Sequence, residues 1–242
     1  MNNRTEVTKR IVRNSLRALG LEVRRVRESR LSGTFPPHNQ FLLTGTAQNY
    51  FIHDGYRHRA ESAYFDDTVN TDSWQREVYR FAREVFDAEN LTNVCDVGCG
   101  SAFKLLRYFN DCATIGFDVA PTCQWLRKKY PGHSWIDLDF AKPPALQSDL
   151  VITADVIEHV QCPDDLLSFV QALRPQYVVF STPDRNLLNA GTHDGPPLNP
   201  AHVREWNYAE FQAYIKSRFK VLEHFISNAF QSTQCVLCSP IC

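Results

Sequence analysis

The sequence lacks the long apolar runs and the low-complexity tracts that mark membrane-spanning or disordered chains. Within its 242 residues, no stretch approaches the roughly 18 to 20 apolar residues that a membrane-spanning helix needs. It also contains no internal repeat, which makes a solenoid or propeller unexpected. We therefore expect a soluble or peripheral protein built around one hydrophobic core.

The chain has eight cysteines but lacks the context that would give them a structural role. Its first residues do not resemble a secretory signal, so we expect reduced thiols in a cytoplasmic protein. Cys235, Cys238 and Cys242 form a C-x2-C-x3-C run, yet no second pair supplies the remaining ligands of a metal knuckle. We predict that these thiols belong to a final β-strand.

Positive charge is scarce outside the N-terminus. The net charge is −1, but residues 1–30 hold nine Arg or Lys against three Glu, which leaves the remainder mildly acidic. Broad nucleic-acid binding requires a basic face, so we do not expect it, although a locally basic groove stays open.

Residues 7–19 alternate so that apolar and basic side chains occupy opposite halves of a helix, and Gly20 is placed to end it. Such a basic amphipathic helix could contact the inner face of a membrane as a peripheral anchor. It could also be an Arg-rich transit peptide, or pack on the body or on a second subunit. The sequence leaves the oligomeric state open.

We expect three segments: the basic helix in residues 1–30, a linker or lid in residues 31–70, and a catalytic domain in residues 71–242. The middle segment has Gly33, a Pro pair and many aromatic residues but no sustained period. A helix should follow, with Thr71 and Asp72 as cap candidates and apolar residues at helical spacing. The apolar positions of that helix are Trp74, Val78, Phe81 and Val85.

From residue 93 onward, strand and helix patterns alternate, which predicts βαβ units and a parallel sheet. The predicted strands are 93–97, 113–117, 134–136, 150–154 and 177–180, and the intervening helices are 104–109, 123–129 and 165–173. Asn207 and Glu210 then form a capping box for a helix that we extend to Phe219. Two closing strands are expected at 221–226 and 234–237.

A glycine-containing turn follows the first of these strands. Gly98 and Gly100 allow the backbone to approach a ligand at a helix N-terminus. A dinucleotide fingerprint would require a third glycine where Phe103 stands, and this disfavours a nicotinamide oxidoreductase. An acid, Asp96, precedes the first glycine by two positions.

The pattern D-x-G-x-G at a strand end resembles the first motif of class I S-adenosylmethionine-dependent methyltransferases, over roughly residues 75–240. The resemblance implies an α/β, Rossmann-like, doubly wound fold with a mostly parallel seven-stranded sheet and helices on both faces. It also implies S-adenosylmethionine as cofactor, held by Asp96, Gly98 and Gly100. Asp118, twenty residues after Gly98, would accept hydrogen bonds from the ribose hydroxyls. Asp137 would lie beside the adenine, with Asp139 as the alternative.

The segment from Asp155 to Val160 resembles the D-V-x-E-H-V run of many small-molecule and glycan methyltransferases. The resemblance places Asp155 at the methionine part of the cofactor and His159 near the acceptor. After the fifth strand, residues 199–206 read N-P-A-H-V-R-E-W, which is similar to methyltransferases found with polysaccharide and lipopolysaccharide assembly. We expect His202 of this loop to share one crevice with the loop after the fourth strand.

These patterns favour O-methylation of a hydroxyl on a sugar or glycan, with His159 and His202 as the catalytic residues. One alternative is a ubiquinone-type O-methyltransferase acting on a quinone precursor or small phenol. An amino-sugar N-methyltransferase and an inactive cofactor-binding subunit also stay open.

A divalent cation is a further hypothesis. Asp155, Glu158 and His159 stand at positions i, i+3 and i+4, so a helical turn would present them on one face, with His202 on the neighbouring loop. Small-RNA 3′-end 2′-O-methyltransferases show a similar E-x-x-E-H arrangement and use metal, although here Asp155 replaces the first Glu. These four ligands would suit Mg²⁺, Mn²⁺ or Zn²⁺. The alternative makes the histidines plain general bases.

Overall fold

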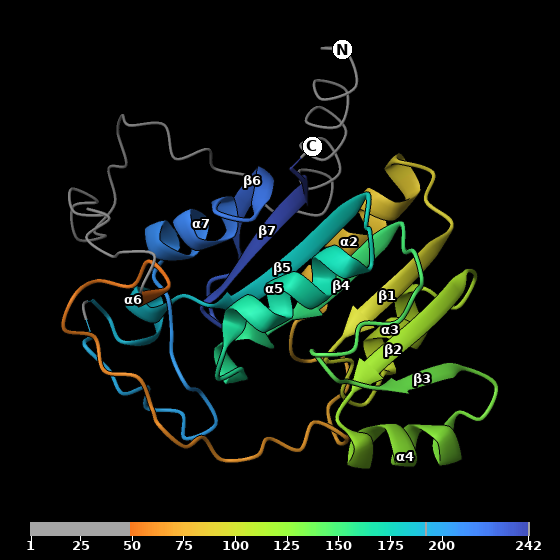
Figure 1. The fold of residues 1–242 in the computed structure, drawn as a ribbon, viewed down its shortest axis with the longest axis horizontal. Coiled ribbons are helices and arrows are strands. Elements are labelled where there is room, and N and C mark those ends of the chain that lie inside the picture. The colour runs from red at the N-terminus through yellow and green to blue at the C-terminus, as the bar shows by residue number, and fades with distance from the viewer. Residues whose placement is uncertain (1–48, 192, 242) are drawn as a thin grey trace, which may run out of the picture.

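The chain folds around one seven-stranded sheet in a computed structural model that describes residues 49–191 and 193–241 (Figure 1). The strands follow the order β3-β2-β1-β4-β5-β7-β6. Strand β7 runs antiparallel to both of its neighbours, and the remaining pairs are parallel. The strands are β1 (Asn93–Val97), β2 (Ala113–Asp118), β3 (Ser134–Asp137), β4 (Leu150–Ala154), β5 (Tyr177–Pro183), β6 (Phe219–Asn228) and β7 (Thr233–Pro240).

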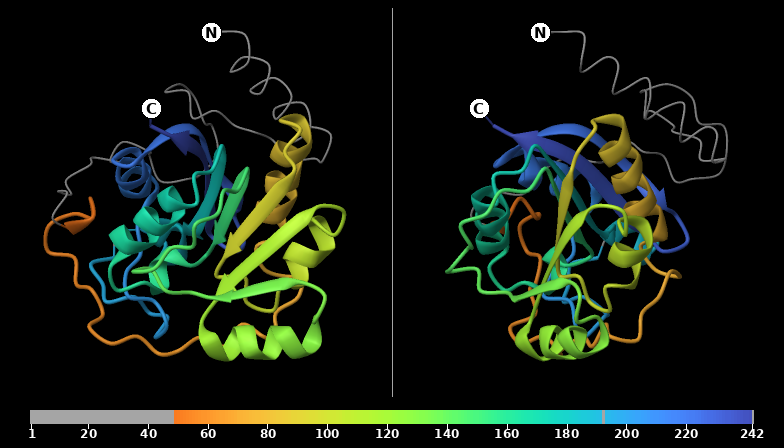
Figure 2. Two further views of the ribbon diagram at one scale, coloured as in Figure 1. Left: turned by 45° about the vertical axis from the view of Figure 1, so that its right-hand side comes forward. Right: turned by 90° about the vertical axis from the view of Figure 1, so that its right-hand side faces the viewer.

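Helices cover both faces of this sheet, as the right-hand view of Figure 2 makes plain. Buried side chains of α2 (Arg76–Ala88) and α3 (Phe103–Tyr108) belong to one apolar cluster. Those of α5 (Pro163–Ala172) and α7 (Tyr208–Lys216) belong to a second cluster. The remaining helices are α4 (Ala120–Lys129), the short α6 (Arg185–Leu188) and the 3-10 turn η2 (Ile157–His159). The predicted doubly wound, mostly parallel seven-stranded fold is confirmed.

The composition of β4 explains its central place. All five residues are buried, and successive side chains enter different clusters: Leu150 and Ile152 one, Val151 the other. A parallel strand covered on both faces requires such a continuous apolar run.

Helix α2 begins later than the cap candidates predict. The Asp72 carboxylate accepts a hydrogen bond from the Tyr108 hydroxyl at 2.9 Å, and the Thr71 carbonyl accepts one from Lys104 Nζ at 3.1 Å. Asp72 also pairs with Arg76 of α2 at 3.1 Å. Neither residue caps the helix, because Gln75, in a left-handed conformation, precedes the first helical residue. Trp74 lies outside the helix and is half exposed.

The capping box of α7 forms as predicted, with both reciprocal hydrogen bonds between Asn207 and Glu210. The helix ends at Lys216 rather than at Phe219, because Phe219 begins β6 and pairs with Pro240. Cys235 and Cys238 are free, buried thiols on β7, as the strand interpretation predicts. Cys242 and the predicted helix at 7–19 lie outside the described residues.

Residues 49–75, which we call the strap, pass along the edge of the sheet where β1 ends, in orange to gold in Figure 1. Backbone hydrogen bonds tie the strap to the loop after α6: Arg57 N donates to Asp194 O, and Ala63 N donates to Pro200 O. Ile52 and Tyr56 are buried in the second cluster. The described part of the expected linker is thus packed against the domain. Among the described helices, none has the length and apolar character needed to cross a membrane.

Candidate active site

The strand order reverses between β1 and β4, and ligands of open α/β sheets bind beyond the carboxyl ends of the strands at such a point. The turn after β1 lies here. Gly98 and Gly100 have φ values of +81° and +51°, which favour glycine. A Cβ on Gly98 would overlap Val156, and one on Gly100 would overlap Asp67 of the strap. Both glycines are therefore required by close approach as well as by conformation.

A first cavity of about 580 Å³ lies above this turn, a volume within the usual range for small-molecule sites. Gly98, Gly100, Asp118 and Asp155 line it from the sheet, and Leu138 and Phe140 contribute apolar surface. The strap contributes Ser62 through Phe65, Asp67 and Gln75. The cavity thus combines a flat apolar region with carboxylates at strand ends.

Asp118 and Asp137 are register partners at the ends of β2 and β3, but their surroundings differ. Asp118 lines the first cavity and accepts hydrogen bonds from Gly100 N at 2.7 Å and Val119 N at 2.8 Å. Burial raises its pKa. Asp137 instead forms a half-exposed ion pair with Arg127 at 2.7 Å. Leu138 lines the first cavity, and neither Asp137 nor the alternative Asp139 does.

Asp96 is fully buried behind the turn and accepts a hydrogen bond from the Tyr79 hydroxyl at 2.7 Å. Burial raises the pKa of Asp96 to about 7, partly offset by that hydrogen bond. It is not among the residues that line the first cavity. Its contact with a ligand would therefore be indirect, through the turn that it supports.

A second cavity of about 450 Å³ adjoins the first. The two share Phe65, Gln75, Asp155 and His159. The second cavity is lined by aromatic and aliphatic side chains, by amides and by carboxylates, and its described lining includes no Lys or Arg. The further lining residues are Asn70, Trp74, Glu158, Pro183, Leu188, Asn189, Leu198, Asn199, His202, Glu205, Gln231 and Thr233.

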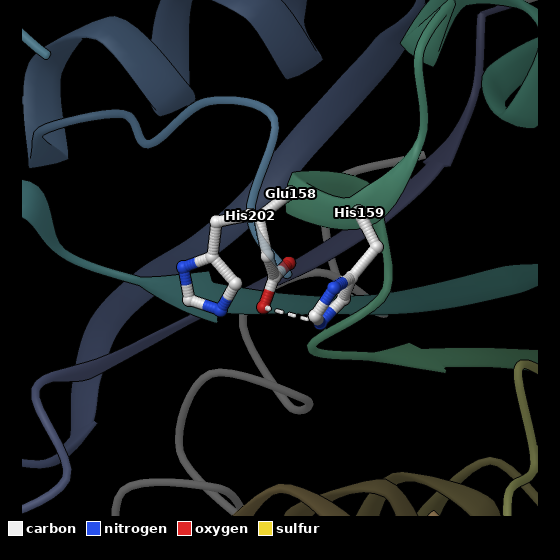
Figure 3. Close-up of side chains that lie close together, drawn as sticks. All are labelled: Glu158, His159 and His202. Carbon is white, nitrogen blue, oxygen red and sulfur yellow. Dashed lines mark ion pairs between the residues drawn. The ribbon is translucent and has the colours of Figure 1, made fainter. Parts of the chain in front are cut away.

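Glu158, His159 and His202 converge at this second cavity, with the carboxylate between the two rings (Figure 3). One ligand-type atom from each residue lies within 4.8 Å of the others. His159 Nδ1 contacts the Ala201 carbonyl at 2.9 Å. Because a carbonyl only accepts, Nδ1 carries the proton and the lone pair is on Nε2.

The tautomer of His202 follows from the same reasoning. Its Nε2 lies 3.0 Å from the Asn199 side-chain nitrogen, which donates, and its Nδ1 lies 2.7 Å from Glu205 Oε1. His202 therefore donates to Glu205 and accepts at Nε2. His159 therefore has a lone pair available on Nε2, as a general base or a metal ligand requires, whereas the Nε2 lone pair of His202 accepts from Asn199.

Glu158 is the buried member of this group, with no exposed surface. Thr182 Oγ1 donates to its Oε2 at 3.0 Å, whereas Oε1 has no hydrogen-bond partner and lies 4.0 Å from His159 Nε2. Burial, with repulsion from Asp155, raises the pKa of Glu158 to about 8. A proton or a cation is needed to compensate such a group.

Asp155 does not join this cluster, contrary to the predicted four-ligand set. The expected helical turn does not form at that position, because Asp155 has a left-handed φ of +52° and η2 begins only at Ile157. Its carboxylate accepts from Ser181 Oγ at 2.6 Å. It occupies the boundary between the two cavities instead.

Several lining residues were not found from the sequence. Phe65, Asp67 and Gln75 come from the strap, where no periodic pattern marks them. Glu205 belongs to the quoted loop motif, but no role was predicted for it from the sequence. In the structure it contacts His202 Nδ1 at 2.7 Å.

Two cavities adjoin at the reversal point of this doubly wound sheet, and the second contains imidazole side chains. This arrangement is typical of enzymes that transfer a group from a cofactor to an acceptor. Residues 57–236 match the family model of the methyltransferase domain. The chain belongs to this family and is an S-adenosylmethionine-dependent methyltransferase.

Solved structures support this fold. A chain of the complex between the Haloferax volcanii Trm112 methyltransferase activator and a candidate methyltransferase is 14% identical, with a TM-score of 0.55 over 70% of this chain and 91% of that one. The methyltransferase domain of bacterial CtHen1 is 20% identical, with a TM-score of 0.51 over 68% and 98%. Magnesium protoporphyrin IX methyltransferase from Synechocystis PCC 6803 is 16% identical, with a TM-score of 0.50 over 69% and 83%. A search of curated proteins finds no match.

Proposed function

We propose that the enzyme O-methylates a hydroxyl of a sugar or glycan. The observation that supports this most is the junction of the two cavities at Asp155 and His159. A donor in the first cavity and an acceptor in the second would meet there, at the close, in-line geometry that methyl transfer requires. The donor supplies a methyl group activated by a sulfonium charge.

In this proposal the first cavity orients the donor. The Asp118 carboxylate, held by two backbone N–H groups, accepts hydrogen bonds from the ribose. Gly98 and Gly100 form the turn below the donor, and Asp155, at the boundary of the two cavities, would face the sulfonium. Leu138 and Phe140 offer apolar surface to the base.

The lining of the second cavity favours a neutral, hydroxyl-rich acceptor. Phe65 and Trp74 provide aromatic surface, and Asn189, Asn199 and Gln231 provide amide donors and acceptors. Its described lining carries three acidic side chains and no Lys or Arg, so it offers no basic side chain to a phosphate or carboxylate of the acceptor.

His202 is the best placed general base. With the acceptor hydroxyl in place of the Asn199 amide, its Nε2 can accept the hydroxyl proton while Glu205, at Nδ1, stabilises the imidazolium that results. His159 Nε2 is the second basic position in the same cavity and stacks on Phe65 of the strap, with ring centroids 5.7 Å apart.

As the alternative to this base role, we propose a divalent cation at Glu158, His159 and His202. The partnerless Glu158 Oε1, and two imidazoles whose Nδ1 atoms are already engaged, fit such a group. With Asp155 outside the set, two nitrogens and one carboxylate favour Zn²⁺ or Mn²⁺ over Mg²⁺. The cation would supply a Lewis acid for the acceptor hydroxyl.

We further propose that the protein is peripheral at a membrane through residues 7–19. In support, Trp74 and Leu198 of the second cavity are exposed, and so is Phe230 beside the lining residue Gln231. An apolar rim of this kind suits an acceptor carried on a lipid.

Transfer of radiolabelled methyl groups to fractionated acceptors tests the proposal. We expect label in neutral glycans or lipid-linked sugars. Label confined to phenols or quinone precursors would favour the ubiquinone-type alternative, and label in amino sugars would favour N-methylation. Donor binding without transfer to any fraction would indicate an inactive subunit.

A further inference from the structure

Asp67 is a strap residue that lies directly over the glycine turn. A Cβ on Gly100 would overlap the Asp67 carboxylate, so this side chain occupies the space that glycine leaves open. It lines the first cavity together with Gly98, Asp118 and Asp155. The strap is fixed on both sides of it, since the Tyr64 hydroxyl contacts Thr122 Oγ1 at 3.3 Å and Ser101 Oγ donates to Asn70 O.

The Asp67 side chain is partly buried, and its carboxylate is incompletely paired. Its Oδ1 atom is buried without a hydrogen-bond partner. Burial raises the pKa of Asp67 to about 6; nearby Asp118 and Asp155 add to the increase, and Lys104 opposes it. The preceding residue behaves differently, because Asp66 Oδ1 accepts from both the backbone N and the hydroxyl of Thr68. The Asp66 carboxylate thus stabilises the turn, whereas the Asp67 carboxylate makes no hydrogen bond to it.

A buried carboxylate of this kind is compensated by a positive charge that arrives with a ligand. The methyl donor carries two such charges, the sulfonium and the ammonium of its methionine part. The sulfonium must face the second cavity, at Asp155 and His159, for transfer to occur. Asp67 lies over Gly100 and lines the first cavity but not the second, so it is on the donor side of that boundary.

We propose that Asp67 binds the ammonium group of the donor, so that the strap completes the donor site. This inference rests on the methyl donor and not on the sugar acceptor. The strap would then act as a clamp whose position depends on the bound donor.

Calorimetric titration of the full chain with three ligands tests this. S-adenosylmethionine carries both charges, S-adenosylhomocysteine keeps only the ammonium, and methylthioadenosine has neither. In Asp67→Asn, the affinities for the first two should fall about tenfold to a hundredfold, the range of one charge-assisted hydrogen bond. The affinity for methylthioadenosine should be unchanged. Asp66→Asn is the matched control and should bind all three ligands as the wild type does.

Other outcomes overturn the proposal. A loss for S-adenosylmethionine alone would place Asp67 at the sulfonium, and an equal change for all three ligands, or none, would give it a structural role. Asp67→Ser provides a second variant if the first fails to fold, and it should show the same ligand pattern. Because no acceptor is present, a failure here leaves the sugar proposal untouched, whereas a wild type that ignores S-adenosylmethionine would contradict the donor site itself.

Discussion

Asp118 and Asp137 are register partners at the ends of neighbouring strands, but only Asp118 lines the first cavity, so we expect different effects on donor binding when each is replaced. Asp118→Ala should raise the dissociation constant for S-adenosylmethionine about tenfold to a hundredfold, because hydrogen bonds to a charged acceptor are worth about 1.5 to 3 kcal/mol. Asp137→Ala removes the same group from the register partner and should leave donor affinity unchanged. Calorimetry measures both, with thermal unfolding as a check on folding. Equal losses in the two variants would contradict the assignment of Asp118.

The Glu158 cluster gives a second prediction at this scale. Zn²⁺ or Mn²⁺ at one hundred times its dissociation constant should stabilise the wild type by about 2.7 kcal/mol. Glu158→Gln should abolish that stabilisation, whereas Asp155→Asn should retain it, because Asp155 lies outside the cluster. Thermal unfolding of chelator-treated protein provides the measurement. If no cation stabilises the wild type, the histidines act as bases without metal.

The sequence predicted the three side chains of this cluster. Glu158 and His159 follow β4, His202 lies in the loop after the neighbouring parallel strand β5, and both loops leave the same edge of the sheet. It could not predict that Asp155 leaves the set, since that depends on a left-handed backbone conformation. Nor could it predict Asp67, whose position arises from the path of the whole strap.

Among the elements, the strap and the glycine turn depend on each other. Gly100→Ala adds a methyl group at φ +51° that overlaps Asp67. We expect it to destabilise the fold by about 1 to 2 kcal/mol and to weaken donor binding at least tenfold, as the strap is displaced. Chemical unfolding and calorimetry measure the two effects.

Gly132→Ala serves as the control, because a Cβ at that position meets nothing within 4 Å. A Gly100→Ala protein that binds the donor as the wild type does would show that the strap is not part of the donor site.

The bounds of the elements were predicted best for strands that are buried on both faces of the sheet, because a continuous apolar run marks them in the sequence. The bounds of β1 and β4 agree with the apolar runs, and the capping box of α7 forms as expected. The start of α2 was not predictable, because Thr71 and Asp72 contact α3, and Asp72 also pairs with Arg76, without capping the helix. Long-range contacts therefore decided what local propensity could not.

At the scale of the whole molecule, the basic segment and the apolar rim suggest a membrane surface as the working environment. The full chain should adsorb to anionic vesicles at low salt, and added salt should release it. Deleting residues 1–30 should abolish adsorption while donor affinity persists. Sedimentation with vesicles measures the first property and calorimetry the second.

A full-length protein that ignores anionic vesicles would contradict the membrane proposal without affecting the enzyme. Vesicle binding that survives the deletion would move the contact to the rim around Trp74, Leu198 and Phe230.

The bond that receives the methyl group tests the central claim most directly. The enzyme would be supplied with S-adenosylmethionine carrying a carbon-13 methyl group and with the acceptor fraction that takes up label, and the product would be examined by NMR. The account predicts a methyl ether on a sugar carbon, formed at the junction of the two cavities. A labelled methyl group on nitrogen, on carbon or on a phenolic oxygen would contradict it.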